Sequence, residues 1–328
     1  MRLHRVISRI SVSLCLSSML VLGNLAYSQE ADIAKYPQRP ITYIISVLPG
    51  VPADLACRLI VKEAEKSLGQ PIVLLNKAGG SGTLGPSTIA ASKPDGYTLG
   101  FVGQGPAFAV PLLEKVAYHP VKDLNYIMQF GINNFGVYVR ADSPFKTWQD
   151  LIAYARKNPQ KATYGTTGVT SLHNIVTEQI ALKEKVEFSL MPFKSGSESQ
   201  AAILGGHIHF AVGDLPYPLV EAGKIRVLLV FKDKRDPLDP DTPAFSDFGY
   251  DTPFPTMLNV VGPKALPEGI VKKIDQAFHN AMKAPAFIKG MQMLHIPPFY
   301  RSSRELNEYV AQNYTLFAKI FKEKGLIK

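Results

Sequence analysis

The sequence predicts an α/β protein of two domains. At 328 residues, the chain is long enough for two domains that each have a core. Apolar runs of strand length are repeatedly followed by Gly-, Pro- or Ser-containing turns and then by helical periodicity. Strands and helices that alternate in this way form βαβ units and parallel sheets. The proportions of apolar residues, 46%, and charged residues, 19%, are typical of a globular protein.

Residues 1–28 have the three parts of a secretory signal peptide. Three arginines lie within the first nine residues, an apolar segment follows at 10–25, and Ala26-Tyr-Ser28 offers small residues for cleavage. We therefore expect a periplasmic mature chain. Removal of this leader lowers the formal charge from +9 to +6, an excess that suits an anionic ligand. The lysines and arginines are spread along the chain, so we expect no nucleic-acid partner.

The first unit after the leader is a strand predicted at 40–47. It runs through Leu48-Pro-Gly-Val-Pro-Ala-Asp54 into a helix that extends to Lys66. Asp54 is positioned to cap this helix, and ligand contact is its second candidate role. Such a turn brings free N–H groups and a positive helix end to the carboxyl edge of the sheet, where they attract an anion. By itself the motif is equally typical of an ordinary βα turn.

A second strand, at 71–75, leads into the Gly-rich segment 76–85 and a helix at 87–92. This segment does not match a nucleotide-binding loop, because Pro86 follows its last Gly and no G-x-G-x-x-G spacing is present. We therefore expect no cofactor. A third strand, at 98–102, ends in Gly103-Gln104-Gly105.

The rest of the chain continues the alternation and then becomes rich in helix. Strands are predicted at 137–140, 162–164, 188–193, 208–212, 227–231 and 257–261, and helices at 143–154, from 172, at 198–204, at 267–283 and at 303–324. We interpret domain 1 as discontinuous, comprising 36–130 plus 254–328, with domain 2 inserted at 131–253. Two chain crossings then form a hinge, and the strand-end loops converge on the cleft.

Several short motifs follow one another along nearly the whole mature chain. They are Tyr36-Pro-Gln-Arg-Pro-Ile41, Pro49-Gly50 with Asp54, Gly69-Gln-Pro71, Asn76 to Gly85, Lys93-Pro-Asp-Gly-Tyr-Thr98, His119-Pro-Val-Lys-Asp123, Tyr164-Gly-Thr-Thr-Gly168 with Ser171 and His173, Pro192-Phe-Lys194, Leu204-Gly-Gly206 and Ala222-Gly-Lys224. Together they make the chain resemble the periplasmic substrate-binding proteins of tripartite tricarboxylate transporters, often called the Bug family.

The resemblance implies a two-lobed periplasmic binding protein (type II, flytrap-like) in which each lobe is a mainly parallel sheet flanked by helices. Such a protein delivers a small carboxylate to membrane permease subunits, holding it through backbone N–H groups of the interdomain loops. We expect a monomer with no catalytic residue and no metal. The ligand contacts implied by the resemblance are Leu48, Val51, Ala53, Asp54, Gly80, Ser81, Gly103, Gln104, Thr167, Val169, Thr170, Ser171, His173, Lys194 and Asp214.

The first loop departs from the family pattern, since Val51 replaces the usual Gly and Ala53 the usual Thr. Pro52 lacks an N–H and Ala53 lacks a hydroxyl, so this loop offers fewer hydrogen-bond donors. Val51, Pro52 and Phe193 can instead cover an aliphatic chain or ring. We therefore expect a ligand less polar than a tricarboxylate, namely a monocarboxylate, with aromatic acids among the candidates.

Other functions and roles stay open. Ser171, His173 and Asp214 invite a hydrolase interpretation, which we rank below binding because no G-x-S-x-G motif is present. A ligand sensor for a membrane signalling partner would use the same cleft. Lys194 is equally consistent with a ligand-facing cation and a solvated loop residue. His207 and His209 share a strand face without a third metal ligand, and we interpret them as exposed.

Overall fold

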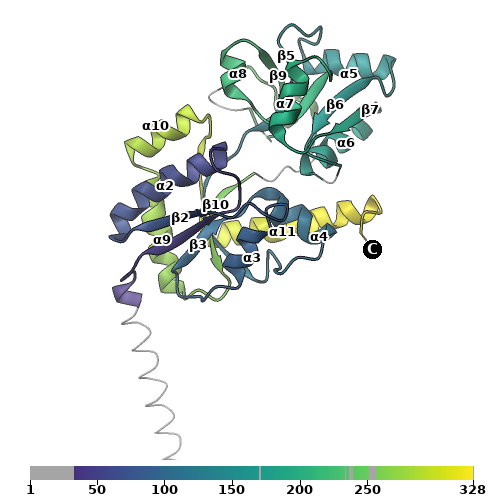
Figure 1. The fold of residues 1–328 in the computed structure, drawn as a ribbon. Coiled ribbons are helices and arrows are strands. Elements are labelled where there is room, and N and C mark those ends of the chain that lie inside the picture. Colours follow the sequence, from purple (N-terminus) through teal and green to yellow (C-terminus); the bar gives the residue numbers. More distant parts are fainter. Residues whose placement is uncertain (1–32, 170, 233, 236–238, 251–255, 328) are drawn as a thin grey trace, which may run out of the picture.

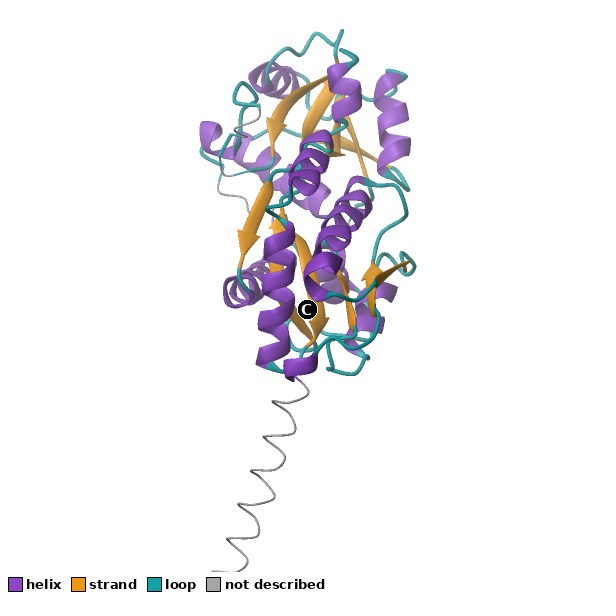
Figure 2. Cartoon of the chain, turned by 90° about the vertical axis from the view of Figure 1, so that its left-hand side faces the viewer, coloured by secondary structure: helices purple, strands orange, loops and turns teal. Residues whose placement is uncertain are grey.

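The fold is described from a computed structural model, which covers residues 33–327 apart from 170, 233, 236–238 and 251–255. The predicted leader and Thr170 lie outside the described residues. Figure 1 shows two lobes, and in the view of Figure 2 the strands of the two lobes lie one above the other between helices. Within the described part of the chain, no helix is both long and apolar enough to span a membrane.

The first lobe contains a six-stranded sheet in the order β11-β4-β10-β3-β1-β2. The strands β1, β2 and β3 are parallel to one another, β10 is antiparallel to β3 and β4, and β11 is antiparallel to β4. The bounds are β1 (Ile41–Ile45), β2 (Ile72–Asn76), β3 (Thr98–Phe101), β4 (Leu124–Gly131), β10 (Leu258–Pro263) and β11 (Pro298–Arg301).

The second lobe contains a five-stranded sheet in the order β7-β6-β8-β5-β9. Here β6, β7 and β8 are parallel, while β5 is antiparallel to both β8 and β9. The bounds are β5 (Phe135–Arg140), β6 (Ala162–Thr166), β7 (Phe188–Pro192), β8 (Phe210–Asp214) and β9 (Ile225–Val230). The predicted two-lobed α/β fold is confirmed.

The sheets are mixed, yet most strands of each point the same way, as predicted, because only β10 and β11 in the first sheet and β5 in the second run against the others. Both follow the same plan, in which three parallel strands are followed by one antiparallel strand that enters from the other lobe: β10 in the first sheet and β5 in the second. The chain leaves and re-enters each sheet at the same edge, so the entering strand must run against its neighbours. This strand membership supports the proposed division into 36–130 plus 254–328 and 131–253.

Helices cover both faces of each sheet. On β1, Tyr43 packs against α2 and α9, while Ile44 faces α3 and α11. On β5, Val137 packs against α5 and α6, and Tyr138 against α7. This alternation follows from the two-residue period of a strand. The helix bounds are α2 (Pro52–Leu68), α3 (Leu84–Ala90), η1 (Gly105–Ala109), α4 (Val110–Leu113), α5 (Trp148–Lys157), α6 (Leu172–Glu184), α7 (Gly196–Leu204), α8 (Tyr217–Glu221), η2 (Phe245–Phe248), α9 (Glu268–Ala281), α10 (Pro285–Met293) and α11 (Ser303–Glu323).

Candidate functional site

The crossing at 132–134 joins the carboxyl edges of the two sheets. Gly131 at the end of β4 is the register partner of Leu258 at the start of β10. Phe135 at the start of β5 is the partner of Asp214 at the end of β8. The loops that follow β1, β3, β6 and β8 therefore leave their sheets at the edges that this crossing connects (Figure 1). Most of the predicted ligand contacts lie on these loops.

In the first lobe, the β1–α2 loop is fixed by Asp54. Its carboxylate accepts hydrogen bonds from the Gly50 backbone N–H at 2.8 Å, from Asn76 Nδ2 at 2.8 Å and from both Nε and Nη2 of Arg58 at 2.9 and 3.0 Å. Burial raises the pKa of Asp54, but the bonds from Arg58, Asn76 and Gly50 outweigh it and hold the pKa below its usual value.

Asp54 is not the N-cap of α2, which corrects the sequence-based expectation. Val51 is the N-cap residue and makes no side-chain capping bond, while Pro52 begins the helix. Asp54 is the third residue of α2, within its first turn, and is only 1% exposed. Both oxygens of the Asp54 carboxylate already accept hydrogen bonds from groups of the same lobe. The Asp54 side chain therefore holds the β1–α2 loop in shape. The backbone N–H groups of this loop remain as the groups that could contact a ligand.

The other two loops of the first lobe pack closely onto the end of β1. Ser46 is buried there, and its hydroxyl accepts a hydrogen bond from the Gly103 N–H at 3.4 Å. A Cβ on Gly85 would lie 3.0 Å from the Ser46 Cβ, and a Cβ on Gly82 would lie 2.9 Å from the Pro106 ring. The Gly-rich segment is therefore needed for close approach. Through this close approach, exposed Gly80 and Ser81 lie at the same edge of the sheet as half-buried Gln104, which follows β3.

In the second lobe, Asn174 plays the part that Asp54 plays in the first. This side chain is 2% exposed. Its Nδ2 donates to the Val169 carbonyl at 2.7 Å and to Glu178 Oε1 at 3.0 Å, and its Oδ1 accepts from the Tyr164 hydroxyl. Gly168 has a φ of +87°, which favours glycine. The loop between β6 and α6 is thus held in shape, with Thr167 and Val169 exposed.

Ser171 and His173 do not form a nucleophile–base pair among the described contacts. The Ser171 hydroxyl caps α6 by accepting from the Asn174 N–H at 3.2 Å, and it donates its proton to the Gly168 carbonyl at 2.9 Å. The His173 ring lies against Phe135, with ring centroids 4.9 Å apart. Burial lowers the pKa of His173 to about 4, so the imidazole is neutral at pH 7. Ser171 therefore has a structural role as a cap.

Asp214 ends β8 beside the loop that follows β6. Its side chain is accessible to solvent, yet protein surrounds it closely enough to raise the pKa of its carboxyl to about 6 by desolvation.

Four exposed apolar side chains lie on the β1–α2 and β6–α6 loops and at the start of α3, and we call them the rim. They are Leu48 (67% exposed), Val51 (36%) and Leu84 (50%) in the first lobe and Val169 (60%) in the second. Ala53 is buried, and Lys194 is an exposed residue whose backbone N–H donates to Glu198 at 3.0 Å.

Some polar atoms near the crossing are buried without a hydrogen-bond partner in the described residues. They include Gln104 Nε2, Asn133 Oδ1 and Thr166 Oγ1. Buried polar atoms are nearly always satisfied in folded proteins, so solute or water is expected to complete them. Sequence analysis found Gln104 but missed Asn133 and Thr166. The Asn-Asn pair between two strands was the available signal for the former.

Three further contacts join the lobes outside these loops. The His295 ring stacks on Tyr217, the Asn134 Nδ2 donates to the His295 carbonyl at 2.6 Å, and Lys324 Nζ lies 2.6 Å from Glu178 Oε2. These contacts were not predicted, because each joins residues more than 75 positions apart in a pattern that the local sequence does not mark. They involve the start of α8 and the residue that follows α11.

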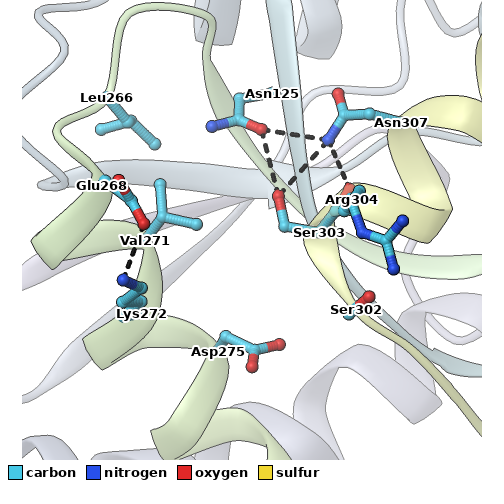
Figure 3. Close-up of a pocket in the computed structure, with 10 residues that line it drawn as sticks. All are labelled: Asn125, Leu266, Glu268, Val271, Lys272, Asp275, Ser302, Ser303, Arg304 and Asn307. Carbon is cyan, nitrogen blue, oxygen red and sulfur yellow. Dashed lines mark hydrogen bonds and ion pairs between the residues drawn. The ribbon is translucent and has the colours of Figure 1, made fainter.

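Two open cavities lie elsewhere. One, of about 470 Å³, is lined by residues of the β4, α9 and α11 region, including Asn125, Ser303 and Asn307 (Figure 3). These three side chains bond to one another, with Ser303 Oγ and Asn307 Nδ2 lying 3.4 and 3.2 Å from Asn125 Oδ1. The other, of about 490 Å³, lies beside β7 and includes Leu182 and Lys324. Neither cavity is lined by a predicted ligand contact.

The described residues contain no group of three or more His, Cys, Asp or Glu side chains that could hold a metal ion. His207 is exposed as expected. His209 differs, because it is half-buried and its Nδ1 lies 2.7 Å from the Thr163 hydroxyl. The sequence pattern indicated one strand face for both histidines, but β8 begins only at Phe210.

Comparisons with known proteins agree with this architecture. The chain is 38% identical over 310 residues to a Cupriavidus necator protein of the gbd 5' region, covering 94% of each chain. A solved periplasmic transporter is 27% identical with a TM-score of 0.78, covering 89% of this chain and 99% of the other. An R. palustris protein solved with adipate is 25% identical with a TM-score of 0.77 and the same coverage.

The protein family described as "Tripartite tricarboxylate transporter family receptor" matches this chain over residues 56–326, which is most of its length. The family resemblance seen in the motifs is thereby confirmed. The chain belongs to the tripartite tricarboxylate transporter receptor family.

Proposed function

We propose that this protein is a periplasmic receptor that captures a small carboxylate between its lobes and presents it to membrane permease subunits. The observation that carries the proposal is the pairing of two equivalent strand–loop–helix units across the crossing. Asp54 fixes one loop and Asn174 the other, and each side chain does so from within its own lobe. Loops fixed in this way present backbone N–H groups to an anion without having to reorganise.

The ligand we propose is less polar than a tricarboxylate. The exposed rim of Leu48, Val51, Leu84 and Val169 supports this, because a solute with an apolar part would cover it. The R. palustris relative was solved with adipate, whose carboxylates are separated by an aliphatic chain. A monocarboxylate with an aliphatic or aromatic group would use the rim and leave fewer buried charges to satisfy.

The test is a thermal-shift and calorimetry panel of citrate, succinate, adipate, benzoate and nicotinate, together with native mass spectrometry of undialysed protein. A ligand at about a hundred times its dissociation constant adds about 2.7 kcal/mol, which raises the melting temperature by about 5 °C. The proposal fails if no carboxylate binds and none co-purifies. Citrate as the strongest ligand would refute the ligand class while leaving the receptor function intact.

A matched pair of variants tests the rim. Val169→Ser should weaken binding of benzoate more than binding of succinate, because it removes apolar cover from the solute. Leu182→Ser is the control, since Leu182 is 69% exposed on α6 beside a different cavity. Equal effects of the two substitutions on benzoate would contradict a role for the rim. Uptake of the identified ligand into vesicles that contain the permease subunits then tests the transport partnership.

A further inference from the structure

The carboxylate of Glu178 on α6 is paired with a lysine of the other lobe. Lys324 follows α11 of the first lobe, and its Nζ lies 2.6 Å from Glu178 Oε2. Figure 1 shows the end of α11 reaching the second lobe near α6. The Lys324 side chain is only 20% exposed, so water screens this pair less than it screens a fully exposed one. Among the described residues, Lys324 is the only cation that pairs with Glu178.

The other oxygen of Glu178 belongs to the network that shapes the β6–α6 loop. Glu178 Oε1 accepts a hydrogen bond from Asn174 Nδ2 at 3.0 Å, and the same amide nitrogen donates to the Val169 carbonyl at 2.7 Å. The two hydrogens of an amide nitrogen allow both bonds at once. Three polar contacts therefore lead from Lys324 in the first lobe to a loop of the second lobe that carries predicted ligand contacts.

The first lobe supports its corresponding loop in a different way. Asp54, which fixes the β1–α2 loop, is paired with Arg58 one turn further along the same helix. The cation that supports this loop therefore moves with it. In the second lobe the cation is Lys324, which belongs to the first lobe, so the support of the β6–α6 loop depends on how the two lobes are placed.

Apolar packing brings α11 and α6 together. Leu172 and Ile175, at the start of α6, are buried in one cluster with Phe317 and Phe321 of α11. Glu178 lies three residues beyond Ile175 on the same helix. Apolar burial has no preferred direction, whereas a charge-assisted hydrogen bond orients the groups that make it. The packing thus places the end of α11 beside α6, and the ion pair orients the Glu178 carboxylate.

We propose that Lys324 is a positioning residue for ligand binding, which holds the β6–α6 loop of the opposite lobe through Glu178 and Asn174. Without the lysine ammonium, the Glu178 carboxylate turns toward water and no longer orients the Asn174 amide. The loop then samples more conformations, and a ligand binds more weakly because its binding must first restore one of them. The effect on affinity rests on the proposed receptor function, whereas the effect on the loop does not.

The first experiment measures amide hydrogen exchange in the ligand-free mature protein. The N–H groups of Gly168, Ser171 and Asn174 make hydrogen bonds inside the loop and report on its opening. In Lys324→Gln they should exchange about threefold faster, which is the size of effect expected from one partly exposed ion pair. Lys324→Arg keeps the charge and should leave the exchange rates near those of the wild type.

Lys319→Gln is the matched control. Lys319 lies on α11, is 72% exposed, and has its Nζ 3.9 Å from Glu323 of the same helix. Its loss should leave the three loop amides unchanged. The Asp150 N–H, which bonds to the Thr147 hydroxyl at the start of α5, shows whether the whole second lobe has loosened. It should exchange at the same rate in every variant.

A double-mutant cycle separates the ion pair from general destabilisation. Glu178→Gln keeps an oxygen that can accept from Asn174 but removes the charge that pairs with Lys324. In a protein that already carries Glu178→Gln, adding Lys324→Gln should change loop exchange by less than about 1.5-fold, because the two residues act as one unit. A full threefold change in that background would show that Lys324 acts without Glu178 and would overturn the inference.

The second experiment titrates the same variants calorimetrically with citrate, succinate, adipate, benzoate and nicotinate. Any of these that binds the wild type should bind Lys324→Gln about threefold more weakly and Lys319→Gln equally well. The inference is overturned if Lys324→Gln changes neither loop exchange nor affinity, if only one of them changes in a protein that binds, or if the control or the Asp150 amide shows the same increase. If no carboxylate binds while the loop amides exchange faster, the receptor function fails and the positioning of the loop stands.

Discussion

The imidazole of His295 stacks on the phenol ring of Tyr217, with centroids 4.2 Å apart and planes 9° from parallel. His295 follows α10 in the first lobe, and Tyr217 begins α8 in the second. His295 Nε2 also lies 2.9 Å from Glu221 Oε1, and its carbonyl accepts from Asn134. One residue thus joins the second lobe through its ring, through a ring nitrogen beside Glu221 and through its backbone carbonyl.

We predict that His295→Ala widens the distribution of lobe separations. The substitution removes the stacking and the Glu221 contact but keeps the backbone carbonyl that Asn134 uses. Single-molecule fluorescence between one dye on each lobe should show a broader distribution than in the wild type. The exposed His207 provides the control as His207→Ala. Distributions that are identical in all three proteins would show that the stack does not restrain the lobes.

We predict that the lobes approach each other when a carboxylate binds. The loops that carry the predicted contacts lie on both sides of the crossing at 132–134, so a solute that touches both sets is held best with the lobes together. Small-angle scattering should give a smaller radius of gyration with saturating ligand. An unchanged radius, with binding confirmed by calorimetry, would mean that the site is already formed without ligand.

We predict that Asp54→Ala destabilises the first lobe by about 3 kcal/mol, because it leaves the Gly50 N–H and the Asn76 amide without their acceptor and separates Arg58 from its partner. Urea unfolding measures this change. The exposed Asp142→Ala is the control and should change stability by less than about 0.5 kcal/mol. Equal effects would contradict the role given to Asp54.

The contribution of Asp54 to the free energy of unfolding should change with pH in a defined direction. Because the folded-state pKa of Asp54 is lowered, its contribution to stability is present above the unfolded pKa of about 3.9 and is lost as the pH falls through the folded value. The stability difference between wild type and Asp54→Asn should therefore shrink below about pH 4. A difference that grows on acidification would refute this assignment.

We predict that Ser171→Ala lowers the free energy of unfolding by about 1 kcal/mol, because the substitution removes the cap of α6. Incubated ester substrates should stay intact with either protein. Hydrolysis by the wild type that Ser171→Ala abolishes would establish catalysis and overturn the cap-only role. Rescue of stability by Ser171→Asp, since aspartate also caps helices, separates the structural effect from a chemical one.

The sequence by itself determined the elements that repeat a local pattern. The runs at β1, β2 and β3 were predicted within two residues at each end, because apolar β-branched residues between Gly or Pro turns have one stable solution. Thr147 is the N-cap of α5, and Asp150 three residues later completes a capping box, which is a local pattern of residue types. The family motifs also gave the two-lobed plan, since they recur over nearly the whole mature chain.

The tertiary structure decided what depends on partners distant in sequence. The strand β11 was missed, because Pro298–Arg301 pairs with β4 at only two positions and is too short to signal itself. The mixed sheet direction follows from where the chain re-enters each lobe, which no local pattern encodes. Asp54 was predicted as a helix cap because its residue type favours one, but Asn76, 22 positions away, makes it a buried anchor of the loop. Local spacing determines which residues reach an edge, and packing decides whether they face the solute or hold the loop that does.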